Sequence, residues 1–130
     1  MIAIDTSVWV EFFRGRQPLA DRVADVLDRD QVALPVPVRI EILSGAPKAE
    51  RSRLARLLSA LPLLVPSEPT WRRIEGWVAT GAAAGHRFGV ADLLVGAIAS
   101  ENDCAVWSLD ADFARMARLG LVSLADPASD

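Results

Sequence analysis

Ile2-Ala3-Ile4-Asp5-Thr6-Ser7-Val8-Trp9 opens the chain with a β-branched run that stops at an acid and passes directly into a helical pattern. An apolar run without polar alternation predicts a short strand that is buried on both faces. The residues after Asp5 predict a helix to Phe13, which Thr6 or Ser7 can cap and which ends near Gly15. A buried strand followed at once by a helix is typical of a parallel α/β fold.

The same alternation of apolar runs and helical patterns recurs along the rest of the chain. The predicted strands are residues 32–34, 63–65, 105–107 and 121–123, and the predicted helices are residues 19–28, 37–45, 48–60, 70–84, 91–101 and 110–118. Apolar strands separated by helices indicate a mainly parallel sheet covered on both faces, which is a three-layer α/β/α sandwich. We expect residues 1–130 to form a single domain with a loose tail from about residue 126.

Composition and charge narrow the class of protein. Of 130 residues 52% are hydrophobic, which is ample for a core. The single cysteine, Cys104, excludes an internal disulfide and lies in an apolar run, so we expect a buried thiol. The N-terminus has no basic leader, and no apolar run approaches the ~20 residues of a membrane span, so we expect a cytoplasmic protein. The net charge of −3 argues against a nucleic-acid coat protein but leaves a nucleic-acid enzyme open.

Four carboxylates lie where a predicted strand ends or a helix begins: Asp5, Glu41, Asp92 and Asp110. Asp5 and Asp110 follow the first and fourth strands, so both belong to the carboxyl edge of the sheet, where parallel sheets form their crevice. Glu41 and Asp92 lie in the first turns of helices that can reach the same edge. Asp5 and Asp110 are also ordinary helix caps, and Asp92 gains from the helix dipole, so each of these three has a purely structural alternative.

Taken together, the acids predict a cation site. Two carboxylates ~4 Å apart repel by about 4 kcal/mol at an effective dielectric near 20, so acids that converge without a lysine need a cation or must protonate in part. Glu41 stands between Ile40 and Ile42, where a structural glutamate has little reason to be. Oxygen ligands select Mg²⁺ or Mn²⁺. The lone histidine, His86, lies in a glycine-rich loop, and we expect it to be solvent-exposed rather than a ligand.

Four segments resemble the motifs of PIN-domain ribonucleases, and most of all those of VapC-type toxins from bacterial toxin–antitoxin pairs. They are residues 4–9, 41–45, 90–94 and 107–113, and their order, their spacing and the chain length agree with the family. The resemblance covers nearly the whole chain. It implies a PIN-like fold and a Mg²⁺- or Mn²⁺-dependent endoribonuclease that acts on structured RNA such as tRNA. It also implies a homodimer and a small VapB-like antitoxin that occludes the site.

The resemblance carries over to individual residues. It implies that Asp5, Glu41, Asp92 and Asp110 are the catalytic, metal-binding acids and that Ser7 and Ser108 are supporting hydroxyls. Asp112 is an alternative fourth ligand, although Asp110 is nearer the strand end. Pro37 stands where the family often has serine or threonine, which affects a helix start and not the chemistry.

The expected chemistry is in-line attack on the scissile phosphate by a water that one or two metal ions activate. Arginine-rich segments are expected to hold the flanking phosphates and to make binding depend on salt. The candidate RNA-binding residues are Lys48, Arg51, Arg53, Arg56 and Arg87. A solvated helix face is the plain alternative for these residues.

Other possible functions agree with fewer features of the sequence. A phosphatase of the haloacid dehalogenase type needs a second aspartate two residues after Asp5, where this chain has Ser7. A receiver domain needs a lysine near the pocket, and the single lysine, Lys48, is poorly placed. A PIN-like binding module without turnover is the non-enzymatic alternative. The aromatic residues Trp9, Phe12, Phe13 and Trp71 belong either to the core or to a partner surface.

Overall fold

Four parallel strands in the order β3-β2-β1-β4 form the sheet of the computed structural model, which describes residues 1–125. The strands are β1 (Ile2–Ile4), β2 (Val32–Pro35), β3 (Leu63–Leu64) and β4 (Ala105–Trp107). Ile2 of β1 is in register with Val32 of β2 and with Ala105 of β4. Every residue of β2 is buried, as expected of a strand covered on both faces.

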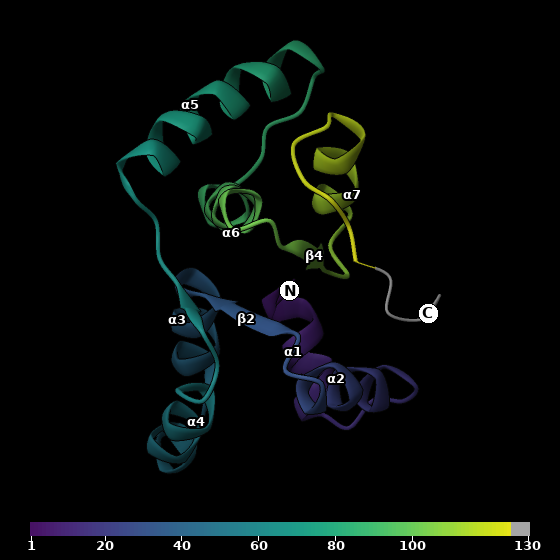
Figure 1. Ribbon diagram of the computed structural model, residues 1–130, viewed down its shortest axis with the longest axis vertical. Coiled ribbons are helices and arrows are strands. Elements are labelled where there is room, and N and C mark those ends of the chain that lie inside the picture. Colours follow the sequence, from purple (N-terminus) through teal and green to yellow (C-terminus); the bar gives the residue numbers. More distant parts are fainter. Residues whose placement is uncertain (126–130) are drawn as a thin grey trace.

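Helices cover both faces of this sheet and confirm the predicted three-layer α/β/α fold (Figure 1). In Figure 1, α1 and α2 lie on one side of the strands, while α5 and α6 lie on the other and α7 packs beside α6. The pair α3 and α4 closes the end of the sheet next to β2. The bounds are α1 (Thr6–Phe13), α2 (Leu19–Asp28), α3 (Val36–Gly45), a 3₁₀ turn η1 (Lys48–Glu50), α4 (Arg51–Leu58), α5 (Glu68–Ala83), α6 (Val90–Glu101) and α7 (Ala111–Arg118).

The helix α6 is the centre of the core, as its apolar sequence predicts. Leu93 and residues 95–99 are buried. Gly96 allows the neighbouring elements to approach closely, because an added Cβ would lie 3.1 Å from both Trp77 and Val122 side-chain atoms. The thiol of Cys104 is buried, as predicted. No helix within residues 1–125 has both the length and the apolar character needed to cross a bilayer.

Three local predictions are wrong. Thr6 and Ser7 do not cap the first helix, because the helix already begins at Thr6 and Asp5 takes the N-cap position. The helix expected over residues 48–60 is divided into η1 and α4, which ends at Leu58.

The strand predicted at residues 121–123 does not form. The chain turns at Gly120 with φ 77° and meets β4 at one bridge, between Val106 and Leu124. The predicted loose tail from residue 126 lies outside the described residues.

Candidate active site

The ends of β1 and β4 bring Asp5 and Ser108 together at the carboxyl edge of the sheet. The backbone N–H of Asp5 donates to the carbonyl of Trp107 at 2.9 Å, which extends the pairing of the two strands. The Asp5 side chain is 7% exposed, and its Oδ2 accepts hydrogen bonds from Ser7 Oγ at 2.9 Å and Ser108 Oγ at 2.8 Å. Two hydroxyls therefore fix the Asp5 carboxylate through one oxygen.

The same two hydroxyls hold the loop that follows β4. The backbone N–H of Leu109 donates to Ser7 Oγ at 3.0 Å, and that of Asp110 donates to Ser108 Oγ at 3.0 Å. Ser7 and Ser108 thus connect Asp5 to the start of α7, across about a hundred residues of sequence. The supporting role that the resemblance implies for the two serines stays a prediction.

Three carboxylates converge where α6 and α7 begin. Asp92, Asp110 and Asp112 each place one oxygen within 4.8 Å of the others. Asp110 also caps α7, because its Oδ1 accepts from the backbone N–H of Asp112 at 2.9 Å. The capping role and the cluster are therefore compatible. Asp112 joins the cluster on the same terms as Asp110, and the geometry does not choose one of them as the fourth ligand.

Arg115 is a positively charged partner of the cluster, and it was not predicted from the sequence. Arg115 donates from Nη1 to Asp112 Oδ1 at 2.7 Å. The sequence did contain a signal for this ion pair, because residues three apart on a helix, such as Asp112 and Arg115, lie on the same face. Although the sequence has no lysine near the acids, Asp112 is ion-paired with an arginine.

Glu41 and Asp5 lie outside the 4.8 Å group of the described residues. Glu41 is exposed on α3, and its Oε1 accepts from Thr6 Oγ1 at 3.1 Å, a partner that the sequence did not indicate. Its neighbour Ile40 is 59% exposed, so the apolar residues around Glu41 in the sequence do not enclose it in the fold. The apolar neighbours of Glu41 therefore give no evidence that it belongs to the site, and Glu41 is linked to the site by its charge.

The charge of Glu41 contributes to the raised pKa of Asp92. Burial, together with the negative charges of Asp110, Asp5, Asp112 and Glu41 in decreasing order, raises the pKa of Asp92 from 3.8 to about 6. An anion in the first turn of a helix normally gains from the helix dipole, so repulsion and burial outweigh that gain here. The other three predicted acids and Asp112 therefore all contribute negative charge around Asp92.

The donor set fits a hard divalent cation. Oxygens on opposite sides of a Mg²⁺ ion lie about 4 Å apart, so carboxylates within 4.8 Å of one another are close to a coordinating arrangement. The cluster contains oxygen donors only, which favours Mg²⁺ or Mn²⁺ over zinc. His86 is half-buried against the ring of Phe88, at 5.8 Å between ring centroids, and is less exposed than predicted.

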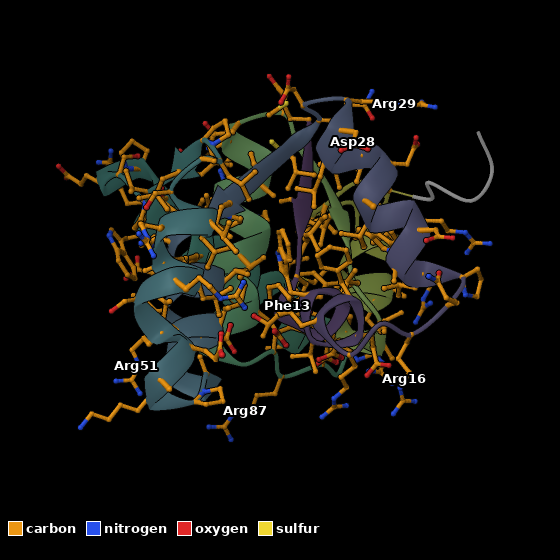
Figure 2. All side chains as sticks on the ribbon, turned by 90° about the horizontal axis from the view of Figure 1, so that it is seen from below. Phe13, Arg16, Asp28, Arg29, Arg51 and Arg87 are labelled. Atoms are coloured by element: carbon orange, nitrogen blue, oxygen red, sulfur yellow. The ribbon has the colours of Figure 1, made fainter. Side chains whose placement is uncertain are left out.

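The predicted RNA-binding residues, Lys48, Arg51, Arg53, Arg56 and Arg87, are all exposed. Figure 2 shows Arg51 and Arg87 pointing outward at one edge of the molecule, with Arg16 at the other end of the same edge. Arg87 lies just before α6, whose first turn carries Asp92. Arginine side chains therefore point outward at several places along this edge, and Arg16 was not among the predicted residues.

Comparisons with known proteins point in one direction. The family described as PIN domain matches residues 2–119. The chain is 34% identical over 125 residues to VapC ribonuclease Mb1587 of Mycobacterium bovis and to ribonuclease VapC11 of Mycobacterium tuberculosis, and each match covers 92% of this chain and 93% of the relative.

Solved structures share the fold at lower sequence identity. VapBC-1 from nontypeable Haemophilus influenzae has a TM-score of 0.78 at 17% identity and covers 98% of this chain and 99% of its own. VapBC2 from Rickettsia felis, bound to a promoter DNA fragment, has a TM-score of 0.76 at 18% identity and covers 96% and 98%. A toxin–antitoxin complex from Klebsiella pneumoniae has a TM-score of 0.73 at 17% identity and covers 98% of both chains.

Proposed function

Because the chain belongs to the PIN domain family, we propose that it is the ribonuclease toxin of a toxin–antitoxin pair, with a Mg²⁺- or Mn²⁺-dependent site. The observation that carries this proposal is the convergence of Asp92, Asp110 and Asp112 beside a fixed Asp5. Relatives named as ribonucleases, matched over nearly their whole length, support the same activity.

Asp92, Asp110 and Asp112 would hold the cation, with Asp5 and Glu41 adding negative charge around it. A bound divalent cation supplies Lewis-acid stabilisation of the phosphate charge and a water of lowered pKa. The hydroxyls of Ser7 and Ser108 keep Asp5 oriented through Oδ2. The site is therefore largely preorganised by the chain itself.

Asp92 or Asp110 would also orient the attacking water. Burial and the surrounding acids, Asp110 first among them, raise the pKa of Asp92 to about 6 in the metal-free protein. A bound divalent cation would offset that repulsion and favour the ionised carboxylate, so Asp92 would act as an ionised oxygen ligand.

The test is RNA cleavage by the purified protein with Mg²⁺ or Mn²⁺, with and without EDTA. Asp5→Asn is the sharpest variant, because an amide oxygen can still accept from Ser7 and Ser108 while the charge is lost. Cleavage should fall at least a hundredfold with an unchanged circular dichroism spectrum. Glu75→Gln, an exposed change on α5, is the matched control and should retain full activity. Cleavage that continues in EDTA would refute the metal mechanism.

The RNA substrate is proposed to be structured RNA such as tRNA. Arg16, Arg51 and Arg87 point outward at separate places along one edge of the molecule, which suits a folded RNA that presents several phosphates (Figure 2). Sequencing RNA ends after expression in cells will identify the target. Cleavage spread evenly over unstructured messages would contradict this choice.

The proposed partner is a small antitoxin encoded beside the toxin and able to occlude the acid site. Solved structures of this fold described as toxin–antitoxin and VapBC complexes support such a partner. Expression of the chain alone should arrest growth, and either Asp5→Asn or co-expression of the neighbouring small protein should relieve the arrest. Equal arrest by Asp5→Asn would separate toxicity from cleavage and favour a binding module.

A homodimer is proposed through an apolar face formed by α3, α5 and the start of α6. Ile40, Trp71 and Val90 are exposed around a hollow of about 500 Å³ on this face. Exposed apolar surface of this kind marks a protein contact, and a second copy is the simplest occupant. Trp71→Glu should convert the dimer to a monomer in light-scattering measurements, whereas Leu57→Gln on α4 should not.

A further inference from the structure

A groove of about 450 Å³ lies between α1 and the α3–η1–α4 segment, and its lining includes Glu41, one of the predicted site acids. Its inner end is lined by Thr6 and Glu41, which are hydrogen-bonded to each other at 3.1 Å. Its outer part is lined by Phe13 and Arg14 at the end of α1 and by Arg53 of α4. Figure 2 shows Phe13 between these two groups of helices. The volume falls within the range of small-ligand sites.

Phe13 offers a fixed aromatic surface to this groove. Its ring stacks on Trp9, with centroids 5.7 Å apart and planes inclined by 24°, and Phe12 supports it at 5.6 Å. Trp9 is 2% exposed and belongs to the core, whereas Phe13 is 48% exposed. One face of the Phe13 ring is therefore held by the protein, and part of the ring is open to a ligand.

Two guanidinium groups flank the aromatic surface. Arg14 is 3.2 Å from Glu11, and Arg53 is 2.9 Å from Glu50. These contacts use one or two of the five N–H donors of each guanidinium, so the rest can bind a ligand. The acids orient the arginines, whose side chains are 60% and 66% exposed. Both arginines are ion-paired, and Glu50 also lines the groove, so the outer part offers guanidinium N–H donors rather than a net positive charge, while Glu41 adds negative charge at the inner end.

We propose that this groove is a nucleotide subsite, in which an unpaired base of the RNA stacks on Phe13 and its phosphate binds Arg14 and Arg53. The inference rests on the proposed ribonuclease function and identifies the substrate feature that the site recognises. The rise of ~1.5 Å per residue along α1 puts Phe13 about 10 Å from Thr6, so the bound base belongs to a neighbour of the reacting nucleotide. Stacking on an aromatic ring accepts any base, so the subsite recognises an unstacked nucleotide rather than a sequence.

The test measures binding of a fluorescent single-stranded RNA hexanucleotide by anisotropy, in EDTA so that metal-dependent cleavage is absent. Phe13→Ala should weaken binding about 5- to 20-fold, because base–aromatic stacking contributes about 1–3 kcal/mol per base and Phe13 is only partly accessible. Phe13→Trp should retain or improve binding. Leu57→Ala, an exposed apolar change on α4, is the matched control and should bind like the unaltered protein.

The arginines provide a second measurement that does not depend on the packing of Phe13. Arg14→Gln and Arg53→Gln should each reduce the slope of log affinity against log salt by about 1. Arg29→Gln, an exposed change at the opposite edge of the molecule from Arg51 and Arg87 (Figure 2), is the matched control and should leave the slope close to that of the unaltered protein. Thermal melting of each variant will show that it is folded.

Several results would overturn the subsite. Unchanged RNA affinity in Phe13→Ala, or equal losses in Phe13→Ala and Phe13→Trp, would exclude stacking. Loss of affinity for the co-purified antitoxin with unchanged RNA affinity would make the groove a protein-docking surface instead. RNA that depends on Phe13 for binding but is not cleaved with Mg²⁺ would support the subsite and refute the ribonuclease. Cleavage that is unaffected by Phe13→Ala would support the ribonuclease and refute the subsite.

Discussion

We expect Asp92→Asn to stabilise the metal-free protein, because the native fold holds this carboxylate among other acids. The pKa of Asp92 is raised from 3.8 to about 6, a difference equivalent to about 3 kcal/mol at neutral pH. The carboxyl is only partly buried, so solvent screening reduces the expected gain to about 1–2 kcal/mol. For a chain of 130 residues this corresponds to roughly 3–8 °C in melting temperature.

The pH dependence of this gain has a definite sign. Asp92 binds its proton more tightly in the folded than in the unfolded protein, so its protonation stabilises the fold fully below pH 3.8. That stabilisation is lost as the pH rises through about 6, where the folded protein must ionise the group. The advantage of Asp92→Asn should therefore be largest above about pH 7 and shrink by more than half at about pH 4.5.

The assay compares melting temperatures of the two proteins in EDTA at these two pH values. Glu75→Gln removes an exposed acid on α5 and should change stability by less than about 0.5 kcal/mol at either pH. Two results would refute the electrostatic reasoning. One is an Asp92→Asn protein no more stable than the original at neutral pH. The other is a gain of the same size at both pH values.

Three further changes test other parts of the structure. Mg²⁺ at a hundredfold excess over its dissociation constant should stabilise the protein by about 2.7 kcal/mol, and Asp92→Asn should lose most of this shift in thermal melts. Ser108→Ala should cost about 1–3 kcal/mol in urea unfolding, because it removes a hydrogen bond to the buried Asp5, and it should also slow cleavage. Gly96→Val should cost about 1–3 kcal/mol by urea unfolding through overpacking against Trp77, and equal stability would contradict the close packing of α6.

Local sequence patterns predicted the elements because the forces that form them act over a few residues. The short apolar runs before Asp5 and after Asp103 became strands, and the apolar pattern of residues 91–101 became the buried helix α6. The strand predicted at residues 121–123 does not form, because a local pattern cannot show whether a segment finds a partner strand. The segment is apolar, but the chain there meets β4 at a single bridge, between Val106 and Leu124.

The sequence predicted the edge of the sheet at which the acids lie, but not which of their side chains come close together. The topology of a parallel sheet places Asp5 and Asp110 at one edge, which the order of strands and helices already implies. It does not decide which carboxylates meet. Asp112 joined the cluster and Glu41 stayed outside it, because the approach of α6 to α7 is set by packing across the core.

The α/β class, the edge of the sheet at which the acids gather and the family could all be predicted from the sequence. These follow from residue types at fixed spacings along the chain. The tertiary structure alone decided that Ser108 reaches Asp5 from 103 residues away, that Arg115 pairs with Asp112, and that Phe13 faces a groove. Such contacts depend on how whole elements pack together. The free energy of this packing is distributed over the whole core, so a local sequence pattern does not reveal it.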